Sequence, residues 1–172
     1  MGVFVGIDVS LENSAVCAVD EHGKLLRETK VASDPGALNA CIRSMPGVVE
    51  AIGIEAGPLS QWLHKSLTDL GLPVVLMETR QVKAALKAAP VKTDRRDAAG
   101  LARLLQMGWF RPVHCKSLSA QELRVLLGAR RSVQDAAINI EMSIRGMLRN
   151  FGLRLGRIGK VSCEDRVREL TE

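Results

Sequence analysis

The chain has 172 residues, a formal net charge of +5, 47% hydrophobic residues and 3% aromatic residues. That hydrophobic content is enough for a packed core and argues against a disordered chain, and the absence of tyrosine excludes any mechanism with a tyrosine nucleophile. No apolar run approaches the ~20 residues of a membrane-spanning helix, the start of the chain lacks the pattern of a signal peptide, and the four cysteines form no CxxC pair, so we expect a cytoplasmic protein with reduced thiols and no membrane partner.

Charge is distributed unevenly along the chain. Residues 1–78 hold 5 basic and 10 acidic side chains, whereas residues 79–131 hold 12 basic and 3 acidic ones. Residues 145–160 add 5 basic side chains and no acidic one. This distribution suits a polyanionic partner such as nucleic acid, although a basic helix surface facing solvent explains it equally well.

The first part of the chain predicts three strands followed by alternating helices and strands. Short apolar runs rich in β-branched residues, joined by tight connections, predict an antiparallel meander and two further strands. The expected strands cover residues 3–10, 14–20, 24–31, 48–56 and 72–78. Capping residues, Pro and Gly at the ends of amphipathic segments predict helices. The expected helices cover residues 34–45, 58–71, 79–87 and 94–107.

This order of elements indicates an α/β fold with a mixed sheet and helices on its faces. RNase H-like domains have this order, and so does each lobe of the actin-like and sugar-kinase ATPases. Both fold classes stay open on the order of elements alone.

Residues 119–151 show the pattern of a long helix. Apolar residues follow alternating steps of three and four for about four heptads, interrupted once by Arg130. The seam consists of Leu123, Leu126, Arg130, Val133, Ala137, Ile140, Ile144, Met147 and Phe151. A helix of this length extends ~45 Å, which favours a coiled coil, between chains or folded back, over a helix packed on its own domain. A Gly-rich basic linker and a short final helix follow.

Four acidic residues stand where a carboxylate is costly. Asp8 and Glu55 end apolar strands, where an unpaired carboxylate is unfavourable, and Asp94 and Asp97 begin a helix at a spacing where like charges repel. Each has a local explanation: an Asx turn, an ion pair, or helix capping. Together they predict a site for Mg²⁺ or Mn²⁺, which prefer hard oxygen ligands and promote displacement at a phosphodiester.

Three motifs carry a resemblance to a known family: GIDVS at 6–10, IEAGP at 54–58 and KTDRRDA at 92–98. In this order they resemble the amino-terminal domain of the DEDD transposases, the one-hundred-and-ten family of bacterial insertion sequences, to which the pilin-gene invertase is related. The resemblance implies a RuvC-like, RNase H-type catalytic domain over residues 1–113. It implies a helical segment for coiled-coil dimerisation, with a basic linker, over residues 114–172.

The resemblance also implies an activity and a set of partners. Asp8, Glu55, Asp94 and Asp97 would be the metal-binding catalytic positions for cleavage and exchange of DNA strands in transposition. DNA, a structured bridge RNA and further copies of the chain, joined through the 119–151 helix, would be the partners. The family's second domain, which supplies a catalytic serine, has no counterpart in this sequence, so we expect a truncated chain without complete activity.

The basic residues then acquire candidate roles in binding phosphates. Beside the acids, the candidates are Lys92, Arg95 and Arg96. On the long helix and the linker, the candidates are Arg124, Arg130, Arg131, Arg154, Arg157 and Lys160.

Three alternatives stay open. In an actin-like ATPase or sugar-kinase lobe, GIDVS would begin a phosphate-binding hairpin, but its connection VSLENS has no glycine to let backbone N–H groups approach a phosphate. A Holliday-junction resolvase would share the fold and the acids without needing the long helix. A non-catalytic binding module would keep the fold and dimerise through the helix.

Overall fold

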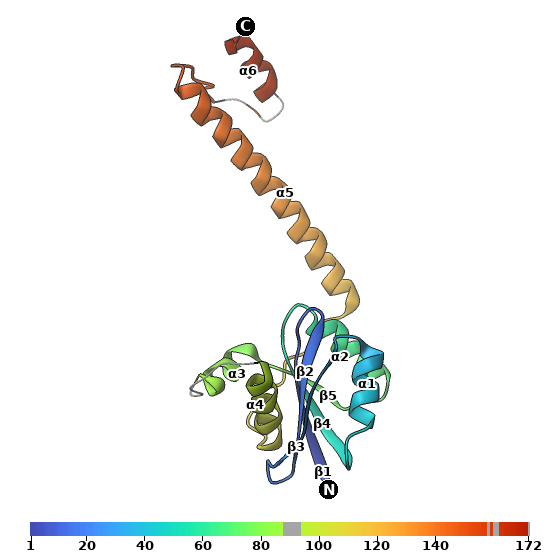
Figure 1. The fold of residues 1–172 in the computed structure, drawn as a ribbon. Helices are drawn as coiled ribbons and strands as arrows, with labels where there is room; N and C mark the ends of the chain where they lie inside the picture. The colour runs from blue at the N-terminus through green and yellow to red at the C-terminus, as the bar shows by residue number, and fades with distance from the viewer. Residues whose placement is uncertain (88–93, 158, 160–161, 172) are drawn as a thin grey trace. The chain divides into compact units, whose positions relative to one another are not determined.

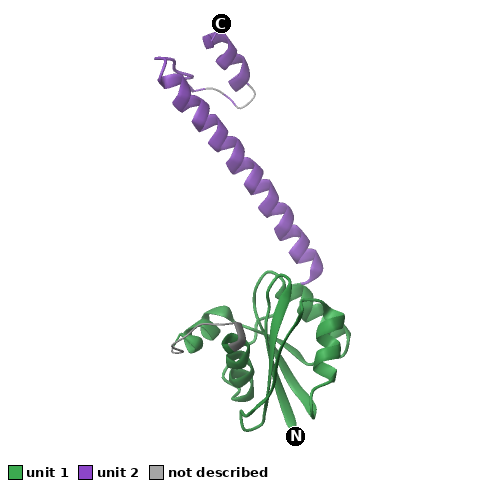
Figure 2. Ribbon diagram, in the orientation of Figure 1, with its two compact units in different colours: residues 1–116 green, residues 117–172 purple. Residues whose placement is uncertain are grey.

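The computed structural model describes residues 1–87, 94–157, 159 and 162–171, with the backbone alone for Asp94 and Arg95. The chain forms two compact units, residues 1–116 and residues 117–172, which Figure 2 shows in different colours. The predicted boundary at residue 113 and the roles predicted for the two parts stay predictions.

Unit 1 contains the strands and helices in the order that the sequence predicts. The strands are β1 (Gly2–Asp8), β2 (Asn13–Asp20), β3 (Leu25–Ala32), β4 (Val48–Glu55) and β5 (Val74–Met77). The helices are α1 (Pro35–Arg43), α2 (Ser60–Asp69), α3 (Thr79–Leu86) and α4 (Asp94–Gln106). The start of α1 shows how residues near a helix end set where the helix begins. The Asp34 side chain accepts a 2.9 Å hydrogen bond from the Ala37 N–H, and proline occupies the first turn.

The strands form one mixed sheet in the order β3-β2-β1-β4-β5. β1, β2 and β3 are antiparallel neighbours, whereas β4 is parallel to β1 and β5 is parallel to β4. This arrangement is a meander extended by two parallel βα units. It confirms the predicted fold class, an RNase H-like (RuvC-like) mixed sheet with flanking helices.

Helices cover both faces of the sheet (Figure 1). On one face, α1 and α2 pack on alternate residues of the strands, so that Val3, Val5 and Ile7 share a core with Leu38 and Leu63. On the other face lies α4, with α3 packed against it. Since strand residues alternate between faces, the even-numbered residues of β1 face α4.

Unit 2 contains α5 (Leu118–Arg149) and α6 (Cys163–Thr171). The long helix predicted over 119–151 is therefore confirmed, and Ser117 caps it by accepting a 3.3 Å hydrogen bond from the Ala120 N–H. Several residues of the predicted seam are exposed: Leu123, Leu126, Val133, Ile140 and Met147, at 57–70%. The coiled coil itself stays a prediction. Among the described helices, none is long and apolar enough to cross a membrane.

Candidate active site

Asp8 and Glu55 end two neighbouring parallel strands at the same edge of the sheet. Ile7 of β1 pairs with Ile54 of β4. Asp8 and Glu55, the next residues, are therefore the last residues of their strands and lie at the same edge. Ile7 and Ile54 both belong to the core on the α1–α2 face, and by alternation Asp8 and Glu55 fall on the face that α4 covers. Both carboxylates are half-buried.

One cavity joins the two carboxylates. It has a volume of about 570 Å³. It is lined by Asp8, Val9, Ser10, Leu11, Glu55, Ala56, Gly57, Pro58, Leu59, Ser60, Thr79 and Lys83. These residues come from the segments that follow β1, β4 and β5, which all end at this edge because the three strands are parallel. The carboxyl edge of parallel strands is the usual place for a ligand in α/β sheets.

Short hydrogen bonds fix the loop that follows Glu55. The Ser60 hydroxyl donates to the Gly57 carbonyl at 2.7 Å and accepts from the Gly57 N–H at 2.7 Å. The Thr79 hydroxyl donates to the Ala56 carbonyl at 2.7 Å. The wall of the cavity is therefore tied both to α2 and to the start of α3.

The first turn of α4 lies toward the same edge of the sheet. At its other end, the Gln106 side chain donates to the Glu21 carbonyl at 2.9 Å, and Glu21 follows Asp20, which pairs with Val3 at the start of β1. Midway, Ala98 lies against Gly6. The helix therefore runs antiparallel to β1, and its 13 residues span ~20 Å at 1.5 Å per residue, about the length of that strand.

This direction of α4 determines where the two acids at its start lie relative to the sheet. Asp97, beside buried Ala98, is half-buried and lies in the turn nearest the edge where Asp8 ends β1. Asp94 begins the helix, and the described residues do not include its side chain. The structure thus brings Asp8 and Glu55 together and directs the first turn of α4 toward them.

The donor chemistry of this edge fits a hard cation. Asp8 and Glu55 offer carboxylate oxygens, and Ser10 adds a hydroxyl to the same cavity; oxygen ligands are those that Mg²⁺ and Mn²⁺ prefer. Among the described side chains, no three of the His, Cys, Asp or Glu residues already stand as a metal-binding cluster. Asp8 and Glu55 are the two described carboxylates that line the cavity.

Sequence reasoning missed two residues of the cavity, Thr79 and Lys83. They lie one turn apart on one face of α3, the helix that begins immediately after β5 ends. Lys83 is exposed and brings a positive charge to a cavity that also holds two carboxylates. The signal was available, because the first turn of a helix that follows a parallel strand lies at the ligand-binding edge of the sheet.

The predicted phosphate-binding residues divide between the two units. In unit 1, Arg96 is exposed on α4, the side chain of Arg95 is not described, and Lys92 lies outside the described residues. In unit 2, the exposed candidates are Arg124, Arg130, Arg131, Arg154 and Arg157. One of them is partly neutralised, since the Nε of Arg131 lies 3.8 Å from the Oδ2 of Asp135. Lys160 also lies outside the described residues.

Known proteins resemble this chain over different lengths. A solved structure of Thermus thermophilus RuvC in complex with a Holliday junction substrate has a TM-score of 0.47 and 20% identity, covering 66% of this chain and all of RuvC. A transposase for insertion sequence element IS1111A from Coxiella burnetii is 27% identical over 163 residues, which are 94% of this chain and 43% of the relative. A putative transposase, y4qE, from Sinorhizobium fredii is 28% identical over 90% of this chain and 40% of its own length.

The chain therefore spans about two fifths of the length of these curated relatives. The family model described as transposase, for the IS110-type DEDD proteins, matches residues 5–152. That match includes both strand-end acids, the KTDRRDA segment and the whole of α5. The chain belongs to the IS110-type DEDD transposase family.

Proposed function

We propose that this chain carries the catalytic domain of a transposase that cleaves and exchanges DNA strands with a divalent cation held by Asp8, Glu55, Asp94 and Asp97. The observation that supports the proposal most is the convergence of Asp8 and Glu55 on one half-buried cavity, toward which the first turn of α4 runs. Carboxylate oxygens are the ligands that Mg²⁺ and Mn²⁺ prefer, and two of them line this cavity.

We assign metal binding to the carboxylates of the site and phosphate binding to the positively charged side chains near it. Asp8 and Glu55 supply oxygens from the ends of strands, which hold side chains more rigidly than loops do. Lys83, at the cavity, and Arg96, on α4, carry positive charge that would bind and orient the phosphodiester before cleavage. When bound, Mg²⁺ or Mn²⁺ would stabilise the charge that develops on the phosphate oxygens during displacement.

Metal binding by the two strand-end carboxylates tests the proposal. The double variant Asp8→Asn with Glu55→Gln should lose Mn²⁺ binding in isothermal titration calorimetry, because it replaces both carboxylates that line the cavity with neutral amides. The matched control is Glu50→Gln with Asp69→Asn, since Glu50 lies on the same strand as Glu55 and Asp69 is exposed on α2.

The control should bind Mn²⁺ as the unmodified chain does. If the Asp8–Glu55 variant instead kept its Mn²⁺ affinity and lost stability, the two carboxylates would be partners in ion pairs or caps, and the metal site would be wrong.

We also propose that DNA and a guide RNA, the bridge RNA of the family, bind this chain. Support comes from family membership and from the exposed arginines of unit 2, such as Arg124 and Arg130. Contacts of this kind bind phosphates without reading sequence, and their affinity falls steeply with salt. The guide RNA would supply the choice of sequence, and a gel-shift series with and without it would test that division.

A third part of the proposal is self-association through the 119–151 helix. Leu126 and Val133 of the seam are 66% and 70% exposed, and a second copy of the helix would bury them. Leu126→Asp with Val133→Asp should therefore produce monomers in light scattering after size exclusion. The control is Val125→Asp with Leu127→Asp, which are 70% and 62% exposed but lie off the seam. If both variants, or neither, changed the mass, the seam would not be the interface.

Family membership favours the transposase over the ATPase-lobe and resolvase alternatives. A thermal-shift comparison distinguishes the transposase from the ATPase lobe. The proposed site predicts stabilisation by Mg²⁺ or Mn²⁺ alone, whereas an ATPase lobe predicts stabilisation that requires ATP.

A further inference from the structure

The chain forms an ordered turn immediately after α5. Gly152 and Gly156 adopt left-handed backbone conformations, with φ of 76° and 68°, which glycine reaches without steric cost. The Leu153 N–H donates to the Leu148 carbonyl at 3.0 Å. Leu148 and Leu155 are only 8% and 5% exposed. The buried leucines and the carbonyl contact together close the end of the helix and hold the turn in place.

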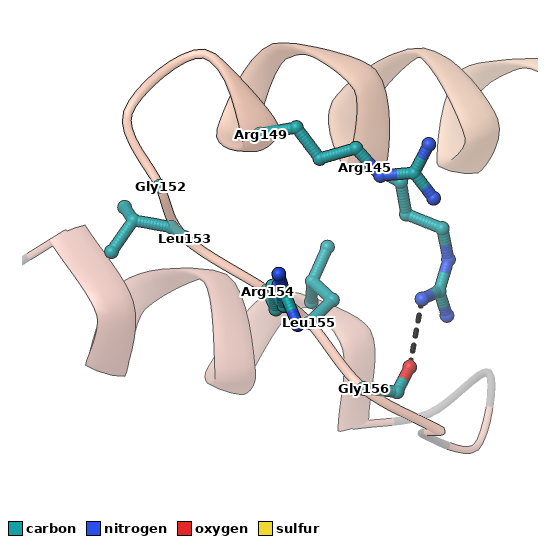
Figure 3. Close-up of a pocket in the computed structure, with 7 residues that line it drawn as sticks. All are labelled: Arg145, Arg149, Gly152, Leu153, Arg154, Leu155 and Gly156. Carbon is teal, nitrogen blue, oxygen red and sulfur yellow. Dashed lines mark hydrogen bonds between the residues drawn. The ribbon is translucent and has the colours of Figure 1, made fainter.

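Arg145 ties the residues after this turn to the helix. We call residues 153–156 the returning segment. Its Nη1 donates to the Gly156 carbonyl at 2.8 Å (Figure 3), and its Nε and Nη2 donate to Oε1 of Glu141 at 3.0 and 2.8 Å. The Arg145 side chain is 22% exposed. Its charge is therefore balanced inside unit 2, and its geometry is fixed by three hydrogen bonds.

A cavity of about 650 Å³ opens between the last turns of α5 and the returning segment. It is lined by Arg145, Arg149, Gly152, Leu153, Arg154, Leu155 and Gly156 (Figure 3). Three arginines line this cavity, which we call the arginine pocket, and none of the lining residues is acidic. Cavities of this size are typical of ligand sites.

Two of these arginines have no balancing carboxylate among the residues that the structure describes. Arg149 and Arg154 are exposed, and within the described residues no carboxylate pairs with either. The negative end of the α5 dipole explains a cation at Arg149, in the last turn. It does not explain Arg154, which lies beyond the helix on the returning segment. Because Arg149 and Arg154 face solvent, their mutual repulsion is screened, and both remain available to attract an anion in the pocket.

We infer that the arginine pocket binds a phosphate group of a nucleic-acid strand. Guanidinium groups form paired, charge-assisted hydrogen bonds with phosphate oxygens, and the pocket is lined by Arg149 from the helix and by Arg154 from the returning segment. Gly152 and Gly156 leave the rim of the pocket without side chains. The inference rests on the proposed function for the kind of ligand, but it concerns a different unit from the carboxylates and assigns a role in binding alone.

The test uses the full chain and a pair of variants with equal loss of charge. Arg149→Gln with Arg154→Gln removes the two unbalanced arginines, and Arg166→Gln with Arg168→Gln removes two arginines that Glu169 and Glu164 already balance. The probes are labelled single-stranded RNA, RNA duplex, single-stranded DNA and DNA duplex of one sequence. Fluorescence anisotropy is measured across a series of salt concentrations.

We expect the pocket variant to bind at least one probe class about tenfold more weakly, with the slope of log affinity against log salt reduced by about 0.7–0.9, which corresponds to the loss of one phosphate contact. The control should bind within about twofold of the unmodified chain. A larger effect on RNA probes would assign the pocket to the guide strand, and a larger effect on DNA probes would assign it to the substrate.

Two results would overturn the inference: equal weakening by both variants, which would mean that only net charge matters, or no change in either. Circular dichroism checks that α5 is intact. If the Gln variant loses helix, Arg149→Lys with Arg154→Lys keeps the charge, and it should retain the salt slope while losing affinity. The pocket variant should bind Mn²⁺ in calorimetry as the unmodified chain does, because the pocket belongs to unit 2 and the carboxylates to unit 1, so failure of the metal site and failure of the pocket are distinguishable.

Discussion

Gly6 of β1 lies directly against the backbone of α4 at Ala98. A Cβ on Gly6 would clash with the Ala98 carbonyl oxygen and would lie 2.5 Å from the backbone nitrogen of Ala102. Backbone atoms of a packed helix cannot move aside as the end of a flexible side chain can. This close approach packs α4 tightly on β1, and the turn that carries Asp97 lies toward the edge where Asp8 ends that strand.

Gly6→Ala should therefore lower the free energy of unfolding of unit 1 by about 1–3 kcal/mol, the usual cost of overpacking a core. Gly57→Ala is the control, because among the described residues the nearest atom to its added Cβ would be the Glu55 carbonyl oxygen, at 4.0 Å. Urea titration followed by tryptophan fluorescence reports on unit 1, since Trp62 and Trp109 both belong to it. Equal losses in the two variants would contradict the packing argument.

Lys83→Gln should strengthen Mn²⁺ binding by about threefold, because a positive charge that lines the same cavity opposes a cation. The same change should weaken cleavage of DNA, for which Lys83 would hold the phosphate. Lys87→Gln, one turn further along at the end of α3, should change neither quantity. Calorimetry measures the first effect and a strand-cleavage assay the second. An unchanged Mn²⁺ affinity in the Lys83 variant would remove this residue from the site.

Acid should remove a stabilising contribution of Asp20, at the β2–β3 turn. The Lys24 N–H donates to the Asp20 carboxylate at 2.9 Å, as does the His22 N–H, and these bonds hold the pKa of Asp20 below its ordinary value of 3.8. A lowered pKa in the folded state means that the contribution is present above that value and is lost as the pH falls through the folded-state pKa.

Asp20→Asn should accordingly lower the urea midpoint at pH 7 and lower it less at pH 3, where the carboxylate is being protonated. Glu21→Gln, at the neighbouring exposed position, is the control. A cost for Asp20→Asn that is the same at both pH values would show that charge on the carboxylate plays no part.

Cys17 should resist alkylation in the folded protein. Burial in β2, and secondarily the charge of Glu28, raise the pKa of the Cys17 thiol to about 11, so at pH 8 only about one thiol in a thousand is ionised. Iodoacetamide followed by mass spectrometry should label Cys115 and Cys163, which are half-buried, long before Cys17. Labelling of Cys17 at a similar rate would mean that β2 opens often.

How far the sequence predicts this protein can be argued from particular elements. The periodicity of 48–56, the Asp34 cap and the heptads of 119–151 are local patterns, and each produced its predicted element because backbone and side-chain preferences act over a few residues. The motifs around Asp8, Glu55 and Asp97 likewise needed only the sequence to indicate the family. Local patterns say nothing about which distant residues meet.

The tertiary structure determines which of these distant residues lie together. Asp8 and Glu55 share a cavity because β4 pairs parallel to β1 with Ile7 opposite Ile54, a register set by burial of one face of the sheet. Lys83 joins them because β5 places α3 at the same edge. Arg149 and Arg154 line one cavity because the chain folds back beyond α5, where Leu148 and Leu155 are buried. In each case long-range packing, which the sequence encodes only collectively, brought together side chains that local preferences leave apart.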